Sequence, residues 1–337
     1  MILNPRERLR RALQHQPIDR LPTQVNYTAR MGQQLAAHFQ VPVAELPARL
    51  GNHFVRVDLT YPARFSDDGR LRYDWWGAGH DTHEEGYFIP GNPLAHSTDL
   101  EAFSWPNPHA PQLLADAVRT IEHDHPDYFI APNFGFALFE RAWSLRGFEQ
   151  IFLDLGRDPD FVAALLDRIV DIQLVLIGRF IELGVDGGYF GDDYGAQKNL
   201  LFSPAMWRKL IKPRLARLFA PFRERGLPVI LHSDGQIQKI LPDLVEIGLT
   251  TLNPVQPEVL DHAWLYEQFH DRLSFYGGIS TQTVLPYGTL DEVSAAVAQC
   301  RRDLSPSGTG LLIGPSHRLM TDIPLPNVAA LLAAFES

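Results

Sequence analysis

The sequence has little cysteine, no long apolar run and no cluster of positive charge. Its one cysteine, Cys300, cannot form a disulfide within the chain, which fits a reducing cytoplasm, and we interpret it as an inert packed thiol. The apolar runs stop well short of the ~18 residues that a membrane-spanning helix needs, and residues 1–8 carry mixed charge and lack the apolar core of a secretory signal. The net charge is -10, so we expect neither nucleic acid nor a membrane as a partner.

What the chain does have is an alternation of helical periods with short β-rich runs. The clearest helix is predicted over 158–182, where Asp158 suits the cap, Pro159 suits the first turn and an apolar stripe follows at helical spacing. A second is predicted over 5–16, after a cap at Asn4. Further helices are predicted over 111–123, 143–155, 203–226 (with bends at Pro213 and Pro221), 236–247, 261–269, 290–301 and 324–335.

Eight β-rich runs precede or separate these helices, at 21–26, 53–59, 128–133, 185–190, 228–232, 250–254, 273–278 and 310–314. Most are continuously apolar, which is typical of parallel strands buried on both faces. The pattern predicts an α/β fold, a (β/α)8 TIM barrel, as one domain over 1–337. An open doubly wound sheet is the alternative, but no glycine-rich phosphate loop follows the first run.

Residues 62–108 break the alternation. They hold the turn signal Asp67-Asp68-Gly69 and a proline-rich stretch that ends at Pro108. We therefore predict a hairpin-bearing insertion after the second strand.

In a barrel of this kind, polar residues at the C-terminal ends of the strands line one mouth. His232 and Asp234 lie at i and i+2 of a strand end, so their side chains aim the same way, and His317 follows the last strand. Two imidazoles and a carboxylate are a typical ligand set for a first-row divalent metal, whereas the alternative is a hydrogen-bonded His–Asp pair without metal. Candidate substrate contacts at the same mouth are Asn26, Tyr27, Asn133, Tyr194 and Gln256.

Carboxylates near other strand ends are candidates for proton transfer. Asp192 and Asp193 are adjacent after the fourth strand, and neighbouring acids can differ in pKa and serve as acid and base; the alternative is an Asx-rich turn that caps a helix. Asp58 is a single carboxylate at the end of the second strand, either an acid or base or a surface residue. Glu140 and Arg141 are interpreted as a buried ion pair.

Several short strings, in order along nearly the whole chain, make it resemble the uroporphyrinogen decarboxylase superfamily from Pro5 to about Asn327. They are N-P-R-E-R at 4–8 with P-I-D-R-L-P at 17–22, G-D-D-Y-G at 191–195, L-H-S-D-G at 231–235, Y-G-G-I at 276–279, and G-P-S-H at 314–317 ahead of P-L-P-N at 324–327. The resemblance implies a (β/α)8 barrel, in agreement with the eight runs.

One branch of this superfamily decarboxylates a tetrapyrrole without metal or cofactor. The resemblance implies that Asp58 matches its catalytic aspartate and His317 the histidine of its late G-H-G-I motif. The R-Q-A-G-R-Y motif that grips propionates in these enzymes is absent, because residues 26–30 read N-Y-T-A-R. Without that arginine clamp, a substrate with eight carboxylates is poorly supported.

The other branch resembles cobamide-dependent methyltransferases, which hold zinc through H-x-C and a later cysteine. His232 matches the first ligand, Asp234 stands where the first cysteine would be, and His317 lies near the place of the second. The resemblance implies metal-assisted methyl transfer to a small molecule, with these three residues on zinc or another first-row metal and Asp192 or Asp193 as general base. A corrinoid protein and a second copy of the chain are the partners it suggests. Cofactor-free decarboxylation of a porphyrinogen through Asp58, and a non-catalytic barrel that binds a corrinoid or tetrapyrrole, remain as alternatives.

Overall fold

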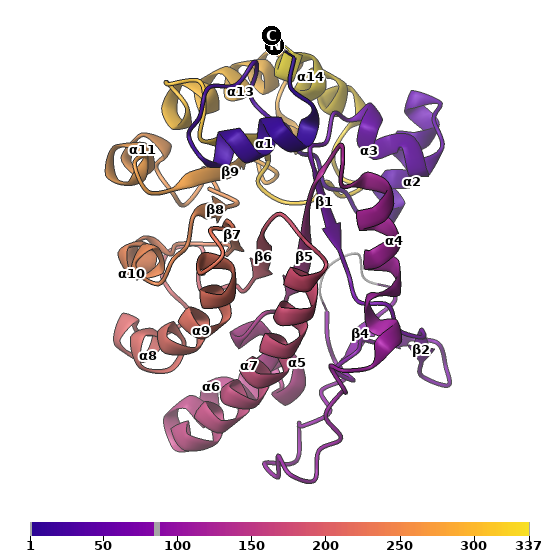
Figure 1. Ribbon diagram of the computed structural model, residues 1–337, viewed down its shortest axis with the longest axis vertical. Helices are drawn as coiled ribbons and strands as arrows, with labels where there is room; N and C mark the ends of the chain where they lie inside the picture. Colours follow the sequence, from indigo (N-terminus) through magenta and orange to yellow (C-terminus); the bar gives the residue numbers. More distant parts are fainter. Residues whose placement is uncertain (1, 84–87, 337) are drawn as a thin grey trace.

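A curled parallel sheet of seven strands forms the centre of the protein (Figure 1). The computed structural model describes residues 2–83 and 88–336. All neighbouring strands of the sheet pair in parallel, and helices surround them, so the α/β class is confirmed. The strand order is β1 (Phe54–Val57), β5 (Phe129–Gly135), β6 (Gly188–Gly191), β7 (Val229–His232), β8 (Thr251–Asn253), β9 (Ser274–Ile279) and β10 (Leu311–Pro315).

The predicted first strand, 21–26, does not form a regular strand, yet it joins the two edges of the sheet. Thr23 bridges to Asn52, which precedes β1, and to Ile313 in β10. A regular strand does not form, because Pro22 has no N–H to donate and because the backbone N–H and C=O of Val25 bond to the side chain of Asn52 (2.7 and 3.1 Å). Further along, Tyr27 forms another isolated bridge, to Leu319 beyond β10. Thr23 thus joins the two edges of the curled sheet, which is consistent with a TIM-like barrel.

The predicted helix over 158–182 is confirmed as α7, with the Asp158 carboxylate accepting from the backbone N–H of Phe161 (3.0 Å). The single helix predicted over 143–155 is wrong, because Gly147, with φ +102°, separates α5 from α6. The helices are α1 (Pro5–Leu13), α2 (Ala29–Phe39), α3 (Leu46–Arg49), α4 (Ala115–Asp124), α5 (Phe139–Arg146), α6 (Phe148–Arg157), α7 (Pro159–Glu182), α8 (Pro204–Leu210), α9 (Lys212–Arg223), α10 (Leu241–Glu246), α11 (His262–Phe269), α12 (Val284–Tyr287), α13 (Leu290–Leu304) and α14 (Leu325–Glu336).

Proline also divides the helix predicted over 203–226. It breaks between α8 and α9, just before Pro213, which cannot donate a backbone hydrogen bond to the preceding turn. Pro221, the second predicted bend, lies inside α9. Helix α2, capped by the hydroxyl of Thr28, was not predicted from the sequence.

The segment between β1 and α4 carries a small antiparallel sheet of β2 (Arg64–Phe65), β3 (Leu71–Tyr73) and β4 (Gly79–Asp81), which lies to one side of the large sheet in Figure 1. Arg141 of α5 reaches this segment, where it forms an ion pair with Asp74 and lies over the ring of Trp76 (5.2 Å to the centroid). The predicted Glu140–Arg141 ion pair is therefore wrong, since the guanidinium ties the small sheet to the barrel instead.

Helix α1 closes the N-terminal end of the barrel. Its Leu9 and Leu13 form one buried cluster with inward-facing side chains from the strands: Phe54, Phe129, Ala131, Tyr189, Ile230, Tyr276 and Leu312. The opposite end, at the carboxyl ends of the strands, is left as the mouth.

Ion pairs of the N-terminal strings hold α1 in place. Buried Arg8 donates to both carboxylate oxygens of Asp19 (2.7 and 2.8 Å) and contacts His53 Nε2 (2.9 Å). Arg6 donates twice to Asp186, at the start of the segment that leads into β6. The N-P-R-E-R and P-I-D-R strings thus fasten α1 to the barrel.

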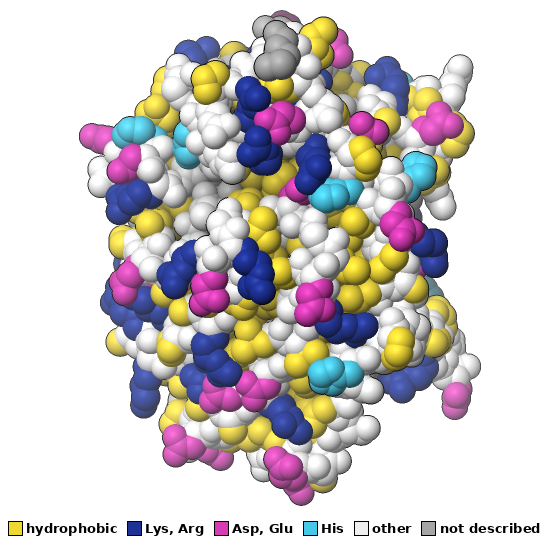
Figure 2. All heavy atoms as spheres, viewed as in Figure 1, with side chains coloured by type: hydrophobic (Ala, Val, Ile, Leu, Met, Phe, Trp, Pro, Cys, Tyr) yellow, Lys and Arg dark blue, Asp and Glu magenta, His cyan; other side chains and the backbone are white. Residues whose placement is uncertain are grey.

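None of the helices in the described part of the chain has the length and apolar character needed to cross a bilayer. On the face seen in Figure 2, acidic and basic side chains are interspersed, without a broad area of either sign.

Burial raises the pKa of the Cys300 thiol, on α13, to about 12, so this thiol stays protonated and unreactive.

Replacing Asp19 with Asn should lower the free energy of unfolding by about 2–3 kcal/mol at pH 7, because it leaves the buried Arg8 guanidinium without its counter-charge. Arg8 holds the pKa of Asp19 well below its usual range, so this stabilisation is complete above about pH 4 and is lost as the pH falls further. Urea denaturation at pH 7 and at pH 3 should show the difference between the two proteins shrinking at the lower pH. Asp271→Asn, at an exposed ion pair, is the matched control with a change below about 0.5 kcal/mol; equal stability of the two variants at pH 7 would contradict the role of Asp19.

Candidate active site at the barrel mouth

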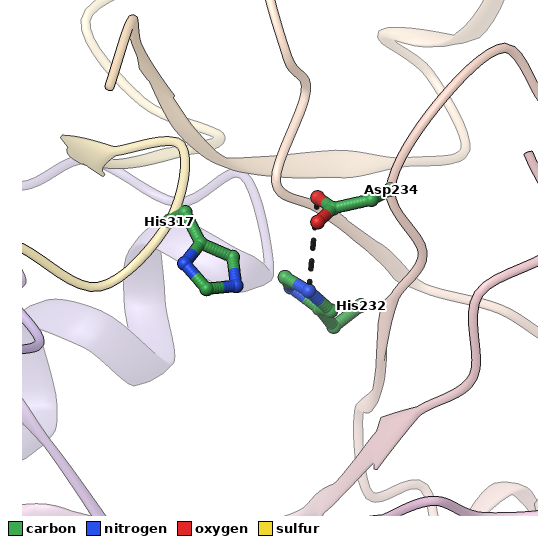
Figure 3. A group of neighbouring side chains, drawn as sticks. All are labelled: His232, Asp234 and His317. Carbon is green, nitrogen blue, oxygen red and sulfur yellow. Dashed lines mark ion pairs between the residues drawn. The ribbon is translucent and has the colours of Figure 1, made fainter. Parts of the chain in front are cut away.

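His232, Asp234 and His317 come together at the mouth (Figure 3). His232 ends β7, Asp234 follows it in the next loop, and His317 lies two residues beyond β10. Each offers one ligand atom, and these atoms all lie within 4.8 Å of one another. His232 Nε2 is 3.7 Å from Asp234 Oδ1, which is longer than a hydrogen bond, so the two side chains face each other without being bonded.

The orientation of the His232 ring is set by Asn253 at the end of β8. Asn253 Oδ1 lies 2.7 Å from His232 Nδ1 and accepts from the Tyr189 hydroxyl (3.2 Å), while Asn253 Nδ2 donates to the backbone carbonyl of Tyr276 (3.1 Å). Since the amide oxygen accepts, His232 Nδ1 must carry the proton. His232 Nε2 is then the nitrogen with a lone pair, and it is the one that faces Asp234.

Burial disfavours charge on the two residues that face His232. It lowers the pKa of His317 to about 4, with a further contribution from the nearby His232. It also raises the pKa of Asp234, although the neighbouring His232 and His317 oppose this shift. Neutral imidazole nitrogens and a carboxylate oxygen suit a divalent first-row cation, and their spacing fits one ion, so the donor set agrees with the predicted metal site.

Two glycines bring the G-D-D-Y-G and L-H-S-D-G loops into contact beneath this site. A Cβ on Gly195 would lie 2.6 Å from the backbone nitrogen of Gln236, and one on Gly235 would lie 2.5 Å from the carbonyl carbon of Gly195. Gly235 also has φ +80°, which other residues rarely adopt. Across the same contact, the Asp193 carboxylate accepts from the backbone N–H of Asp234 (2.8 Å). The two strings are therefore one unit that positions Asp234.

Asp192, a predicted catalytic acid, is fully buried and accepts three hydrogen bonds. The donors are the backbone N–H groups of Phe139 (2.9 Å) and Glu140 (2.6 Å), at the start of α5, and the hydroxyl of Tyr194 (2.6 Å). Burial raises the pKa of Asp192 to about 6, even though these donors favour its ionised form. Asp192 and Tyr194 thus support the start of α5 and do not line the mouth.

Glu140 joins this acidic cluster. Burial, and next the charges of Asp193 and Asp192, raise its pKa well above the usual range. This cluster could not be predicted from the sequence, because Asp192 and Asp193 lie more than fifty positions beyond Glu140 along the chain.

The remaining predicted site residues lie around the barrel but not all in one cluster. Asn133 donates to exposed Asp58 (2.7 Å) at the ends of β5 and β1. Asn26 donates to the hydroxyl of Tyr276 (2.7 Å), and Tyr27 packs against Gly32 of α2.

A cavity of about 280 Å³ adjoins the cluster of His232, Asp234 and His317, and one of the predicted substrate contacts, Gln256, lies in its wall. Its lining is Asp234, Gln256, Thr281, Gln282, Ser316, His317, Arg318, Met320, Asp322 and Ile323. Apart from His317, the lining residues after β9 and β10 were not predicted from the sequence, although Arg318 directly follows that predicted ligand.

The comparisons with known proteins agree with this fold and these motifs. The sequence profile of uroporphyrinogen decarboxylase (URO-D) matches residues 77–337, well over half of the chain. The chain belongs to the uroporphyrinogen decarboxylase family. Among curated relatives, uroporphyrinogen decarboxylases of Bacillus cereus (strain B4264) and Bacillus thuringiensis (strain Al Hakam) are 27% identical over 154 residues, which is 43% of this chain and 42% of theirs. The matched region thus spans less than half the length of these relatives.

Among solved structures, a methyltransferase from Methanosarcina mazei superposes with a TM-score of 0.73 at 20% identity, over 99% of this family member and 98% of that chain. At this identity the likeness establishes a shared fold along the whole chain and nothing further.

Replacing Tyr194 with Phe should lower the free energy of unfolding by about 1.5–3 kcal/mol at pH 8, because the buried Asp192 carboxylate loses a donor. The loss should shrink below about pH 6, where Asp192 becomes protonated and no longer needs a charge-assisted bond. Chemical denaturation at the two pH values measures this. Tyr287→Phe, at a side chain that is 82% exposed, is the control; a Tyr194 variant as stable as this control would refute the support of Asp192 by the phenol.

Proposed function

We propose that this family member catalyses metal-assisted transfer of a small group, a methyl group in the first instance, at the barrel mouth. The observation that carries the proposal is the convergence of His232, Asp234 and His317, with all three ligand atoms within 4.8 Å of one another. The resemblance of the H-x-D string to the H-x-C string of cobamide-dependent methyltransferases supports it, and so does the absence of the arginine motif that grips propionates.

Hydrogen bonds from neighbouring residues hold the proposed ligands in position. Asn253 fixes the proton of His232 on Nδ1 and leaves Nε2 for the metal. Asp193 holds the backbone of Asp234, and Gln256 Oε1 accepts from the backbone N–H of Gly235 (3.3 Å). Loop and ring orientations are thus set by hydrogen bonds before any ligand arrives.

A divalent metal at this site would lower the pKa of an acceptor thiol or hydroxyl, so that the acceptor reacts as an anion. The replacement of cysteine ligands by oxygen and nitrogen favours a harder acceptor or a metal other than zinc. Of the two adjacent acids, Asp193 is the one we propose as general base, because Asp192 is fully buried and its carboxylate accepts from the first N–H groups of α5 and from the Tyr194 hydroxyl. A corrinoid protein is the methyl donor that the resemblance suggests.

Protein purified without a histidine tag should bind one divalent metal per chain, and His232→Ala and His317→Ala should each abolish stoichiometric binding. Asn253→Ala should weaken binding by about 10- to 100-fold, because the His232 ring loses its orienting partner. Affinity should fall as the pH falls, since the imidazoles must be neutral to bind. Metal analysis after equilibrium dialysis measures these changes. His270→Ala, at an exposed histidine, should bind as the wild type does; retention of metal by His232→Ala would end the proposal.

Decarboxylation of a porphyrinogen is the second candidate, because the curated relatives bear that name and Asp58 lies at the carboxyl end of β1. We expect no release of CO₂ from uroporphyrinogen III. We expect metal-loaded protein to demethylate methylcobalamin when small thiols or alcohols are present, and the change in absorbance of the corrinoid measures this reaction. Chelator-insensitive CO₂ release that disappears in Asp58→Asn would replace methyl transfer by decarboxylation. A co-purifying pigment without turnover in either assay would favour a non-catalytic binding barrel.

A further inference from the structure

A second cavity, of about 420 Å³, lies at the end of the barrel opposite the mouth. It opens where the C-terminal end of α1 meets α11 and the amino ends of β9 and β10, elements that lie together in Figure 1. Its lining is Gln14, His15, Tyr266, His270, Asp271, Phe275, Leu304, Ser307, Thr309 and Gly310. None of these residues takes part in the chemistry proposed for the mouth, and the volume lies within the ~300–1,000 Å³ that ligand sites occupy.

His15 occupies a backbone position in this wall that normally favours glycine. It follows the end of α1 with φ +54°, and the backbone N–H of Gln16 bonds back to the carbonyl of Arg11 (2.9 Å), as in the turn with which glycine commonly ends a helix. The imidazole of His15 reaches β9, where its Nε2 lies 3.1 Å from the hydroxyl oxygen of buried Ser274. The side chain is thus held in the cavity wall by a fixed partner.

The hydrogen bonds of Ser274 determine which nitrogen of His15 can accept. The hydroxyl oxygen also lies 3.2 Å from the Leu13 carbonyl, which can only accept, so the hydroxyl proton points there and His15 Nε2 donates to the oxygen. His15 Nδ1 keeps its lone pair, on the ring edge that faces Gly310, where a Cβ would lie 2.8 Å from it. Burial, and next the nearby His270, lower the pKa of His15, so the ring is neutral at pH 7.

His270, just after α11, provides a second nitrogen acceptor. Its Nδ1 lies 2.8 Å from the Tyr266 carbonyl, so Nδ1 carries the proton of the neutral ring and Nε2 keeps the lone pair. The imidazole also stacks on the ring of Tyr266, with centroids 4.7 Å apart and planes 19° from parallel. The hydrogen bond and the stacking together fix the orientation of this second acceptor.

Asp271 gives the wall a negative charge, and the described residues of the lining include neither lysine nor arginine. Arg272 lies 3.2 Å from one oxygen of this carboxylate, but both side chains are more than half exposed, so water weakens the pair. The buried side chains of Phe275 and Leu304 form an apolar part of the same wall. The cavity therefore combines one carboxylate and two neutral nitrogen acceptors with an apolar surface.

These acceptors suit an organic cation better than a metal ion. In the part of the chain that the structure describes, three such ligand atoms lie within 4.8 Å of one another at the mouth, and His15, His270 and Asp271 do not form a second group of that kind. A metal holds its nitrogen and oxygen ligands at about 2.0–2.2 Å, whereas an ammonium nitrogen holds its acceptors at about 2.7–2.9 Å and so spans a wider group. An alkyl chain on the ammonium would also cover the apolar part of the wall.

We propose that this cavity binds a small primary alkylammonium ion, whose N–H groups bond to His15, His270 and Asp271 while its alkyl chain lies on Phe275 and Leu304. The inference does not depend on the function proposed for the mouth, because the two sites lie at opposite ends of the barrel.

Three probes with the same butyl chain separate charge from hydrogen bonding: butylammonium, butyltrimethylammonium and 1-butanol. The Cε1–H NMR signals of His15 and His270, assigned from the spectra of His15→Gln and His270→Gln, follow binding at this cavity during titration at pH 8. The wild type should bind butylammonium at least tenfold more tightly than either other probe, because this ion alone has both the charge and the N–H donors.

Asp271→Asn should weaken butylammonium binding about tenfold, because the ammonium loses its counter-charge. His270→Phe should weaken it severalfold, since phenylalanine keeps a ring on Tyr266 but has no acceptor nitrogen. Asp67→Asn, which removes an exposed acid from the turn between β2 and β3, is the matched control and should bind as the wild type does. No movement of either histidine signal, equal affinity for the three probes, or unchanged affinity in Asp271→Asn would overturn the inference.

Discussion

The hydrogen bonds of one buried amide organise the mouth of this barrel. Asn253 lies on β8, accepts from Tyr189 on β6, bonds to His232 on β7 and donates to the backbone of Tyr276 on β9. Four neighbouring strands therefore meet at one side chain. Because each bond of the amide depends on its orientation, the proton of His232 and the position of Nε2 follow from the packing of the sheet, and not from the loops alone.

Two adjacent acids on the loop after β6 provide a second set of contacts. The Asp192 carboxylate binds the first N–H groups of α5, and the Asp193 carboxylate binds the loop that carries Asp234. Two adjacent acids on one loop thus hold two different elements. Glu140 adds a third carboxyl to the same region: burial raises the pKa values of Glu140 and Asp192, and the charges of Asp193 and Asp192 raise that of Glu140 further.

The features of the fold and site that depend on hydrophobic periodicity and on residue spacing could be predicted from the sequence. Continuous apolar runs indicated buried parallel strands, and the i, i+2 spacing of His232 and Asp234 indicated a shared direction. The sequence could not show that both backbone groups of Val25 bond to a side chain instead of to a neighbouring strand, because the partner, Asn52, lies 27 residues further along the chain. Nor could it show that Arg141 bonds to Asp74 and not to its neighbour Glu140, since adjacent residues on a helix point in different directions. In both cases the outcome depends on a polar partner that is distant in the sequence.

The same reasoning explains how the proposed ligands His232, Asp234 and His317 could replace a sulfur site while keeping its geometry. The loops that carry Asp234 and His317 are positioned by backbone contacts: the Gly195–Gly235 approach on one side and the bond from Ser316 N–H to the carbonyl of Ile279 (2.7 Å) on the other. Neither contact involves the ligand side chains, so the identity of the ligands can change while their placement stays. What changes is the electrostatics: a carboxylate and two neutral imidazoles carry one negative charge, fewer than two thiolates would. A divalent ion would then leave the cluster with a net positive charge, where two thiolates and an imidazole would leave it neutral.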